Sequence, residues 1–223
     1  MTDTIELTGL RGEAELATAT RSRVYGLLGA AFAFPDDELY EAVRDGTLTR
    51  LAAEIAPGLP YALEVPPGLT LDGESTPYVE FESEYIRLFD VGAAGPPCPL
   101  YGGVYGGDRM KVMEEATRFY NFFGLRLSPD MRELPDHITT ELEFLHYLTF
   151  REVEARQQGG DVPSLLRAER DFLARHLCAW VPKMRTRLAK QSAGSFYPAL
   201  VELGVRFFTA DQAYAAAAAR ALA

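Results

Sequence analysis

Apolar residues recur every three or four positions along most of the chain, a spacing typical of amphipathic α-helices. The first stretch of this kind covers residues 13–34, and shorter ones follow over 36–44 and 47–55. Five prolines over residues 57–77 interrupt the pattern, so we expect a loop there.

A glycine- and proline-rich segment separates the next two predicted helices. Thr76 can cap a helix that runs to about Asp90. Residues 91–107 then contain six glycines and three prolines, which forbid a regular helix and permit tight turns close to another surface. Asp108 can cap the following helix, and Gly124 is positioned to end it.

The C-terminal part of the chain carries the strongest helical pattern. The longest helix is expected over residues 136–159, and another begins near Pro163, to be kinked or broken at Pro182. Two more helices are expected over 195–208 and from 211 to the end.

No convincing strand pair, internal repeat or hairpin signal interrupts this succession of helices. The sequence therefore predicts an all-α fold, a single-domain bundle of about eight to ten helices over residues 1–223. Within it we expect an N-terminal half over 12–127, a hinge over 128–135 and a C-terminal half over 136–223.

Composition and charge narrow the classes of function. The 223 residues are 48% hydrophobic and 24% charged, as in ordinary globular domains. A net charge of −10 disfavours binding to nucleic acid and stable association with anionic membranes. The N-terminal residues lack the basic and apolar regions of a signal peptide, so a cytoplasmic location is expected.

One possible function is that of a helical metal-dependent or hydrolytic enzyme, with a centre formed by Glu143, His146 and Cys98. The first two residues have the Glu-x-x-His spacing of di-iron bundles. A di-iron site needs a second such pair and two further glutamates, and neither His137 nor His176 has a glutamate three residues before it. We therefore expect no metal and no cofactor.

A polar patch at the start of the longest helix is more informative. Asp136 can cap that helix, whereas His137 and Glu141 share one of its faces and could form a charge-assisted pair. The glycine- and proline-rich segment over 91–107 could rim an apolar groove beside them. The hypothesis of a cleft requires that residues 91–107 lie close to the start of the helix at Asp136, and it is wrong if the two regions lie far apart.

Four segments, in order, resemble the TorD/DmsD/NarJ family of redox-enzyme maturation chaperones. They are Glu84 to Phe89, Pro96 to Tyr105, Pro135 to Phe144 and His176 to Pro182. The Pro-Pro-Cys-Pro-Leu-Tyr run at Pro96 looks most like the branch that serves type II enzymes of the dimethyl sulfoxide reductase superfamily.

The resemblance implies an all-helical, non-catalytic chaperone, either a monomer or a domain-swapped homodimer. Such a chaperone holds the apo catalytic subunit of a molybdopterin oxidoreductase during cofactor insertion, and many bind that subunit's twin-arginine signal peptide. A structural subunit of the reductase complex is a third possibility. The client- and signal-peptide-binding positions implied by the resemblance are Tyr85, Leu88, Phe89, Pro97, Pro99, Tyr101, Tyr105, Asp136, His137, Glu141 and Trp180.

The charge of the chain agrees with this role, because a twin-arginine signal is basic at its start and apolar in its core. We expect removal of the side chains of Asp136 and His137 together to weaken peptide binding while the thermal melt moves by only a few degrees.

Overall fold

The computed structural model describes residues 10, 12–72, 76–93, 95–126 and 133–222. The α-helices are α1 (Glu13–Phe32), α2 (Asp37–Arg44), α3 (Thr47–Ile55), α4 (Tyr78–Tyr85), α5 (Arg109–Phe122), α6 (Ile138–Gln158), α7 (Val162–Arg175), α8 (Leu177–Leu188) and α9 (Phe196–Ala221). Short helical turns form η1 (Ala56–Gly58), η2 (Ile86–Asp90) and η3 (Gly102–Val104). Extended pairing in the described ranges is limited to two isolated bridges, which confirms the all-α prediction.

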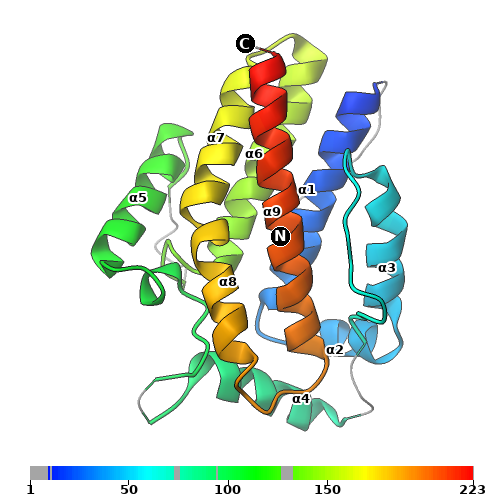
Figure 1. Ribbon diagram of the computed structural model, residues 1–223, viewed down its shortest axis with the longest axis vertical. Coiled ribbons are helices and arrows are strands. Elements are labelled where there is room, and N and C mark those ends of the chain that lie inside the picture. Colours follow the sequence, from blue (N-terminus) through cyan, green and yellow to red (C-terminus); the bar gives the residue numbers. More distant parts are fainter. Residues whose placement is uncertain (1–9, 11, 73–75, 94, 127–132, 223) are drawn as a thin grey trace.

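The long helices α1, α6, α7 and α9 form the centre of an elongated bundle (Figure 1). Helix α1 packs along α6, and α7 packs along α9. Helix α5 lies at one edge, α3 lies at the other, and α4 crosses the lower end. Most of the expected hinge over 128–135 falls on residues 127–132, which lie outside the described residues.

Several predicted helix ends are confirmed, but the N-cap of α4 is Pro77 and not Thr76 as predicted. The side chains of Asp36 and Asp108 accept hydrogen bonds from backbone N–H groups in the first turns of α2 and α5. Gly124 and Gly159 follow α5 and α6 with φ of 76° and 71°, in the left-handed region that favours glycine.

The break near the end of α7 was wrongly predicted at Pro182. It lies at His176, whose φ of −114° and ψ of −103° are not helical. Pro182 is inside α8 and leaves one backbone carbonyl without its usual donor. The helix nevertheless continues, because Trp180 and Met184 on either side of the proline are buried in the core.

The two helices expected over 195–208 and from 211 onward are a single helix, α9. No new helix begins at Asp211, which lies within α9 and whose side chain is fully buried. Its carboxylate accepts hydrogen bonds from Tyr25 at 2.5 Å and from Tyr61 at 2.8 Å.

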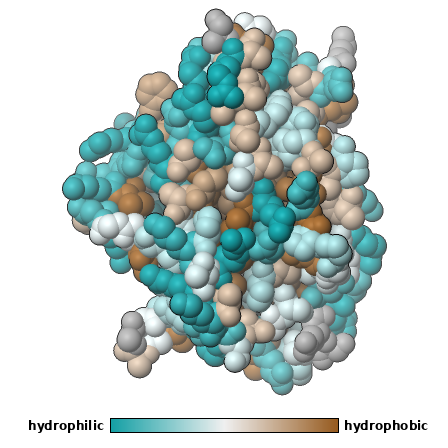
Figure 2. Space-filling view, viewed as in Figure 1, coloured by the Kyte–Doolittle hydropathy of each residue, from teal (hydrophilic) through white to brown (hydrophobic). Residues whose placement is uncertain are grey.

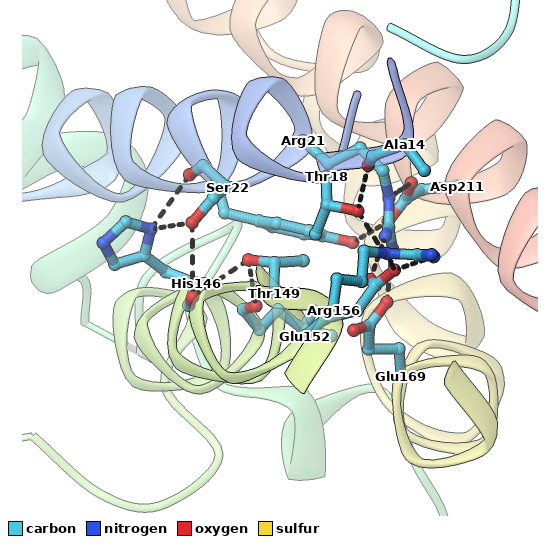
Figure 3. A network of polar contacts seen from close by, with 12 residues as sticks. Ala14, Thr18, Arg21, Ser22, His146, Thr149, Glu152, Arg156, Glu169 and Asp211 are labelled. Carbon is cyan, nitrogen blue, oxygen red and sulfur yellow. Dashed lines mark hydrogen bonds and ion pairs between the residues drawn. The ribbon is translucent and has the colours of Figure 1, made fainter. Parts of the chain in front are cut away.

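A buried ion cluster joins the central helices, as Figure 3 shows around Arg21 of α1. Arg21 contacts Glu152 of α6 at 2.7 Å and Asp211 of α9 at 2.5 Å, and it also pairs with Glu169 of α7. All four side chains are fully buried. Nothing in the helical periodicity of the sequence indicates this cluster.

Hydrophilic and weakly hydrophobic residues are mixed over the face in Figure 2, and the most hydrophobic residues show only as small patches. Among the described helices, none combines the length and the apolar character needed to cross a bilayer.

Candidate functional site

The glycine- and proline-rich segment and the start of α6 lie side by side. Tyr101 and His137 form an isolated antiparallel bridge. The N–H of Gly102 donates to the carbonyl of Asp136 at 2.8 Å, and the N–H of Ile138 donates to the carbonyl of Leu100 at 2.9 Å. The adjacency expected from the sequence is therefore present.

Glycine at position 103 is required by this close approach. Its N–H donates at 2.8 Å to Oδ2 of Asp136, whose side chain is fully buried. A Cβ atom at Gly103 would lie 2.9 Å from that oxygen and 3.1 Å from the Cα of Arg109. Asp136 thus anchors the loop.

The N-cap of α6 is His137, so the expectation that Asp136 caps this helix is wrong. The Asp136 carboxylate bonds to the loop instead. Nδ1 of His137 lies 2.7 Å from Oγ1 of Thr139, and the His137 ring meets the Tyr101 ring edge-on with centroids 4.8 Å apart. Burial lowers the pKa of His137, while Glu133, 3.7 Å away, opposes that shift.

Glu141 does not pair with His137, because its side chain points into the core. Oε2 of Glu141 accepts from the indole N–H of Trp180 at 2.9 Å, and Oε1 lies 3.3 Å from Nδ1 of His176. Burial raises the pKa of Glu141, and the neighbouring His176 partly opposes this by favouring the charged carboxylate. Trp180 also stacks on Tyr105, with ring centroids 5.3 Å apart.

A cavity of about 550 Å³ lies between α1, the α4–η2 region and the start of α6, within the roughly 300–1,000 Å³ of ligand pockets. Gly26, Gly29 and Ala30 of α1, together with Ala33 directly after it, line one wall with small residues. The remaining lining residues are Tyr25, Phe34, Tyr85, Phe89, Asp90, Leu100, Tyr101, Glu133, His137, Thr139, Glu143 and His146. We call this space the α1–α6 cavity.

The α1–α6 cavity combines aromatic surface with negative charge. Its lining includes three carboxylates, those of Asp90, Glu133 and Glu143, and neither lysine nor arginine among the described residues. The Tyr101 hydroxyl donates to Glu133 at 2.5 Å, which fixes the position of that carboxylate. Phe34 is 52% exposed and adds apolar surface. Such a cavity suits a ligand that is both cationic and apolar.

The expected binding residues divide between the cavity and the core. Four of them line the cavity: Tyr85, Phe89, Tyr101 and His137. Leu88, Pro99, Tyr105, Asp136, Glu141 and Trp180 are buried outside it, and Pro97 is half-buried outside it. Residues that do not line the cavity are not placed to contact a ligand held in it.

The small residues of the α1 wall were not predicted from the sequence to line a site. Gly26, Gly29, Ala30 and Ala33 follow the i, i+3, i+4, i+7 spacing that places residues on one helix face. A search for small residues at helical spacing could have found this wall, whereas a search for apolar periodicity passes over glycine.

The residues proposed for an enzyme do not converge. Glu143 and His146 line the cavity, but Cys98 is fully buried outside it, and burial raises the pKa of its thiol. Nδ1 of His146 lies 2.9 Å from both Oγ and the carbonyl oxygen of Ser22 (Figure 3). Within the described ranges, no three side chains of the His, Cys, Asp and Glu type are grouped to hold a metal ion.

Comparison with known proteins identifies the relatives of the chain. The family described as nitrate reductase delta subunit matches residues 37–186. A perchlorate reductase assembly chaperone protein of Dechloromonas aromatica (strain RCB) is 35% identical over 198 residues, covering 85% of this chain and 87% of that protein.

Two further relatives match over shorter regions. A selenate reductase assembly chaperone protein of Thauera selenatis is 47% identical over 126 residues, covering 55% of this chain and 65% of the relative. The chaperone protein TorD of Vibrio parahaemolyticus serotype O3:K6 (strain RIMD 2210633) is 27% identical over 139 residues, covering 61% of this chain and 64% of the relative. These two alignments span slightly less than two thirds of each relative. The chain belongs to the nitrate reductase delta subunit family, the TorD/NarJ family that its motifs resemble.

Proposed function

We propose that this chain is a cytoplasmic assembly chaperone for the catalytic subunit of a molybdopterin oxidoreductase of the dimethyl sulfoxide reductase superfamily. It binds that subunit during cofactor insertion, and it holds the subunit's twin-arginine signal peptide in the α1–α6 cavity before export. The names of its relatives, which are assembly chaperones of perchlorate and selenate reductases, support the general role.

The chemistry of the α1–α6 cavity is the observation that carries the proposal. A twin-arginine signal begins with basic residues and continues into an apolar segment. Asp90, Glu133 and Glu143 offer carboxylates to the guanidinium groups, and guanidinium–carboxylate hydrogen bonds are strong and directional. Phe34 and Phe89 offer apolar contact to the segment that follows.

The expected affinity is moderate. Burial of ~400 Å² of apolar peptide surface contributes ~10 kcal/mol at ~25 cal/mol/Å², and much of this is offset by ordering of the peptide. A dissociation constant near the micromolar range follows. The net charge of −10 accelerates association with a basic peptide more than it tightens the complex. Reversible capture suits a protein that must release its client.

The buried residues of the family motifs hold the glycine- and proline-rich segment over 91–107 in place and do not contact the peptide directly. Asp136 anchors Gly103, and the Trp180 ring stacks on Tyr105 while its N–H is held by Glu141. These contacts fix the segment that carries Tyr101 into the cavity wall. They are positioning residues in this proposal, and the peptide itself does not touch them.

The proposed role contains no catalytic step and needs no cofactor. In this proposal the monomer captures the peptide. A domain-swapped dimer would serve equally if it rebuilt the same cavity.

The test is affinity capture from cells that make the client. The parent chain should retain a molybdopterin oxidoreductase catalytic subunit that still carries its signal peptide, as identified by mass spectrometry. The Asp90→Asn, Glu133→Gln double variant should retain much less. Glu54→Gln, at an exposed carboxylate of α3, is the matched control and should behave as the parent. Equal capture of the client by the double variant and the parent would contradict the proposed site.

A further inference from the structure

A second, smaller cavity lies beside the first. It has a volume of about 230 Å³ and is lined by residues of α5, α6 and the segment that follows α5. The lining residues are Tyr120, Leu125, Arg126, Thr140, Glu143, Phe144 and Tyr147. We call this space the α5–α6 cavity. Its walls are mainly aromatic and aliphatic, so it differs in character from the acidic α1–α6 cavity.

Glu143 belongs to both cavities. In the α1–α6 cavity it is joined by Thr139 and His146, and in the α5–α6 cavity by Thr140 and Tyr147. At 100° per residue, the first pair lies to one side of Glu143 on the α6 surface and the second pair lies to the other. The two cavities therefore occupy adjacent faces of the same helix, and Glu143 stands on the ridge between them.

A buried hydroxyl in the α5–α6 cavity has no partner. Thr140 is 5% exposed, and its Oγ1 makes no hydrogen bond within the described residues. A buried hydroxyl without a partner is costly, and a bound ligand with a carbonyl oxygen would satisfy it. The neighbouring Tyr120 hydroxyl is already satisfied, because it donates to the carbonyl of Pro135 at 2.7 Å.

We propose that one extended ligand spans both cavities: the apolar segment that follows the arginine pair of the client peptide crosses Glu143 and inserts side chains into the α5–α6 cavity. A peptide carbonyl accepts from Thr140, and an arginine of the pair lies against Glu143. This inference rests on the proposed function and adds a second subsite to it.

The charges of the two cavities set the direction of the peptide. Asp90 and Glu133 lie in the α1–α6 cavity, and among the described residues the α5–α6 cavity adds Arg126 and no carboxylate other than the shared Glu143. Basic residues therefore favour the first cavity, and uncharged apolar residues favour the second. Burial raises the pKa of Glu143, and a guanidinium placed beside it would favour its charged form.

Two synthetic peptides test the inference by calorimetric titration. The shorter one ends directly after the arginine pair, and the longer one continues into a stretch of leucine and alanine residues. Thr140→Met fills the α5–α6 cavity with a flexible side chain and removes the hydroxyl. Thr186→Met, at an exposed threonine of α8, is the matched control.

We expect the parent to bind the longer peptide about tenfold more tightly than the shorter one, as the burial of one or two apolar side chains implies. Thr140→Met should abolish that difference and leave the shorter peptide unaffected, whereas Thr186→Met should change neither. If Thr140→Met binds the longer peptide as tightly as the parent does, the second subsite is wrong while the proposed function stands. If neither peptide binds the parent, the proposed function itself fails.

Photocrosslinking of the unaltered protein tests the same inference without relying on the fold of a variant. A photoreactive side chain placed in the leucine stretch of the longer peptide should crosslink within residues 120–126 or 138–147, which belong to α5, its C-terminal end and α6. A photoreactive group beside the arginine pair should instead label α1 or η2. Labelling of α1 by both groups would overturn the inference.

Discussion

Removal of Arg21 is the most informative change to the core. Its guanidinium joins carboxylates from α6, α7 and α9, and every one of these side chains is fully buried. Desolvation opposes the charge of Arg21, but Asp211, Glu169 and Glu152 outweigh it and raise the pKa of Arg21. Substitution by methionine keeps much of the side-chain volume and removes the charge.

The expected loss of stability comes from the buried carboxylates that remain without the Arg21 cation. Without Arg21, the cation that remains at the cluster is Arg156, which pairs only with Glu152 among the described carboxylates. Leaving buried carboxylates without their cation costs about 3–5 kcal/mol. For a chain of this size, 1 kcal/mol corresponds to about 2–4 °C in melting temperature, so Arg21→Met should melt about 10 °C lower than the parent.

Urea unfolding at neutral pH is the appropriate assay. With a slope of about 2–3 kcal/mol/M, the midpoint should fall by about 1–2 M. Burial raises the pKa of Glu169, and removal of the neighbouring Arg21 cation removes the main opposing effect. The destabilising effect of the variant should therefore grow as the pH rises above the ordinary range of a glutamate.

Arg23→Met provides the control, because Arg23 is exposed on the same helix and the change should cost less than about 0.5 kcal/mol. If Arg21→Met loses no more stability than Arg23→Met, the buried cluster does not hold the four helices together.

Three further predictions concern the loop and the core. Gly103→Ala should cost about 1–3 kcal/mol because its Cβ meets backbone and Asp136, while Gly107→Ala, with nothing within 4 Å, should melt like the parent. Asp136→Ala should cost about 1–3 kcal/mol because it leaves the buried N–H of Gly103 unpaired. Its melting temperature should therefore lie well below that of His137→Ala, whereas the sequence alone suggested a change of only a few degrees. Burial raises the pKa of Glu169, so its contribution to stability is complete below about pH 4.3 and declines as the pH rises; urea unfolding of Glu169→Gln should show a weaker decline between about pH 5 and pH 8.

Helical periodicity and capping chemistry were sufficient to predict most of the fold. Asp108, Gly124 and Gly159 mark helix ends because their local chemistry acts within one turn. Local signals failed at Pro182 and Asp211, where tertiary packing decides the outcome. The first stays helical because buried neighbours hold it, and the second is a partner of Arg21.

The sequence located the site but not its inner surface. The pairing of residues 91–107 with the start of α6 was predicted from glycine content and from the Asp-His pair. The direction of each side chain was not. Residues four apart share a face only inside a helix, and His137 is the N-cap of α6 with extended backbone angles, φ −73° and ψ 141°. His137 therefore faces the cavity, whereas Glu141 faces Trp180 in the core. Motif matching cannot distinguish a residue that touches a ligand from one that positions it.

The buried hydroxyl of Thr140 illustrates a further limit. Threonine is unremarkable in a helical sequence, and its lack of a partner emerges only when the side chains of Tyr120 and Phe144 have been placed around it. Unsatisfied polar groups of this kind are properties of the packed structure.

The most direct measurement is a calorimetric titration of the chain with a synthetic twin-arginine signal peptide at low and at high salt. We expect binding in the micromolar range that weakens with salt. We also expect at least a tenfold loss when both arginines are replaced by glutamine or when Asp90→Asn and Glu133→Gln are combined. Binding that is unchanged by all of these substitutions would contradict the assignment of the acidic α1–α6 cavity as the peptide site.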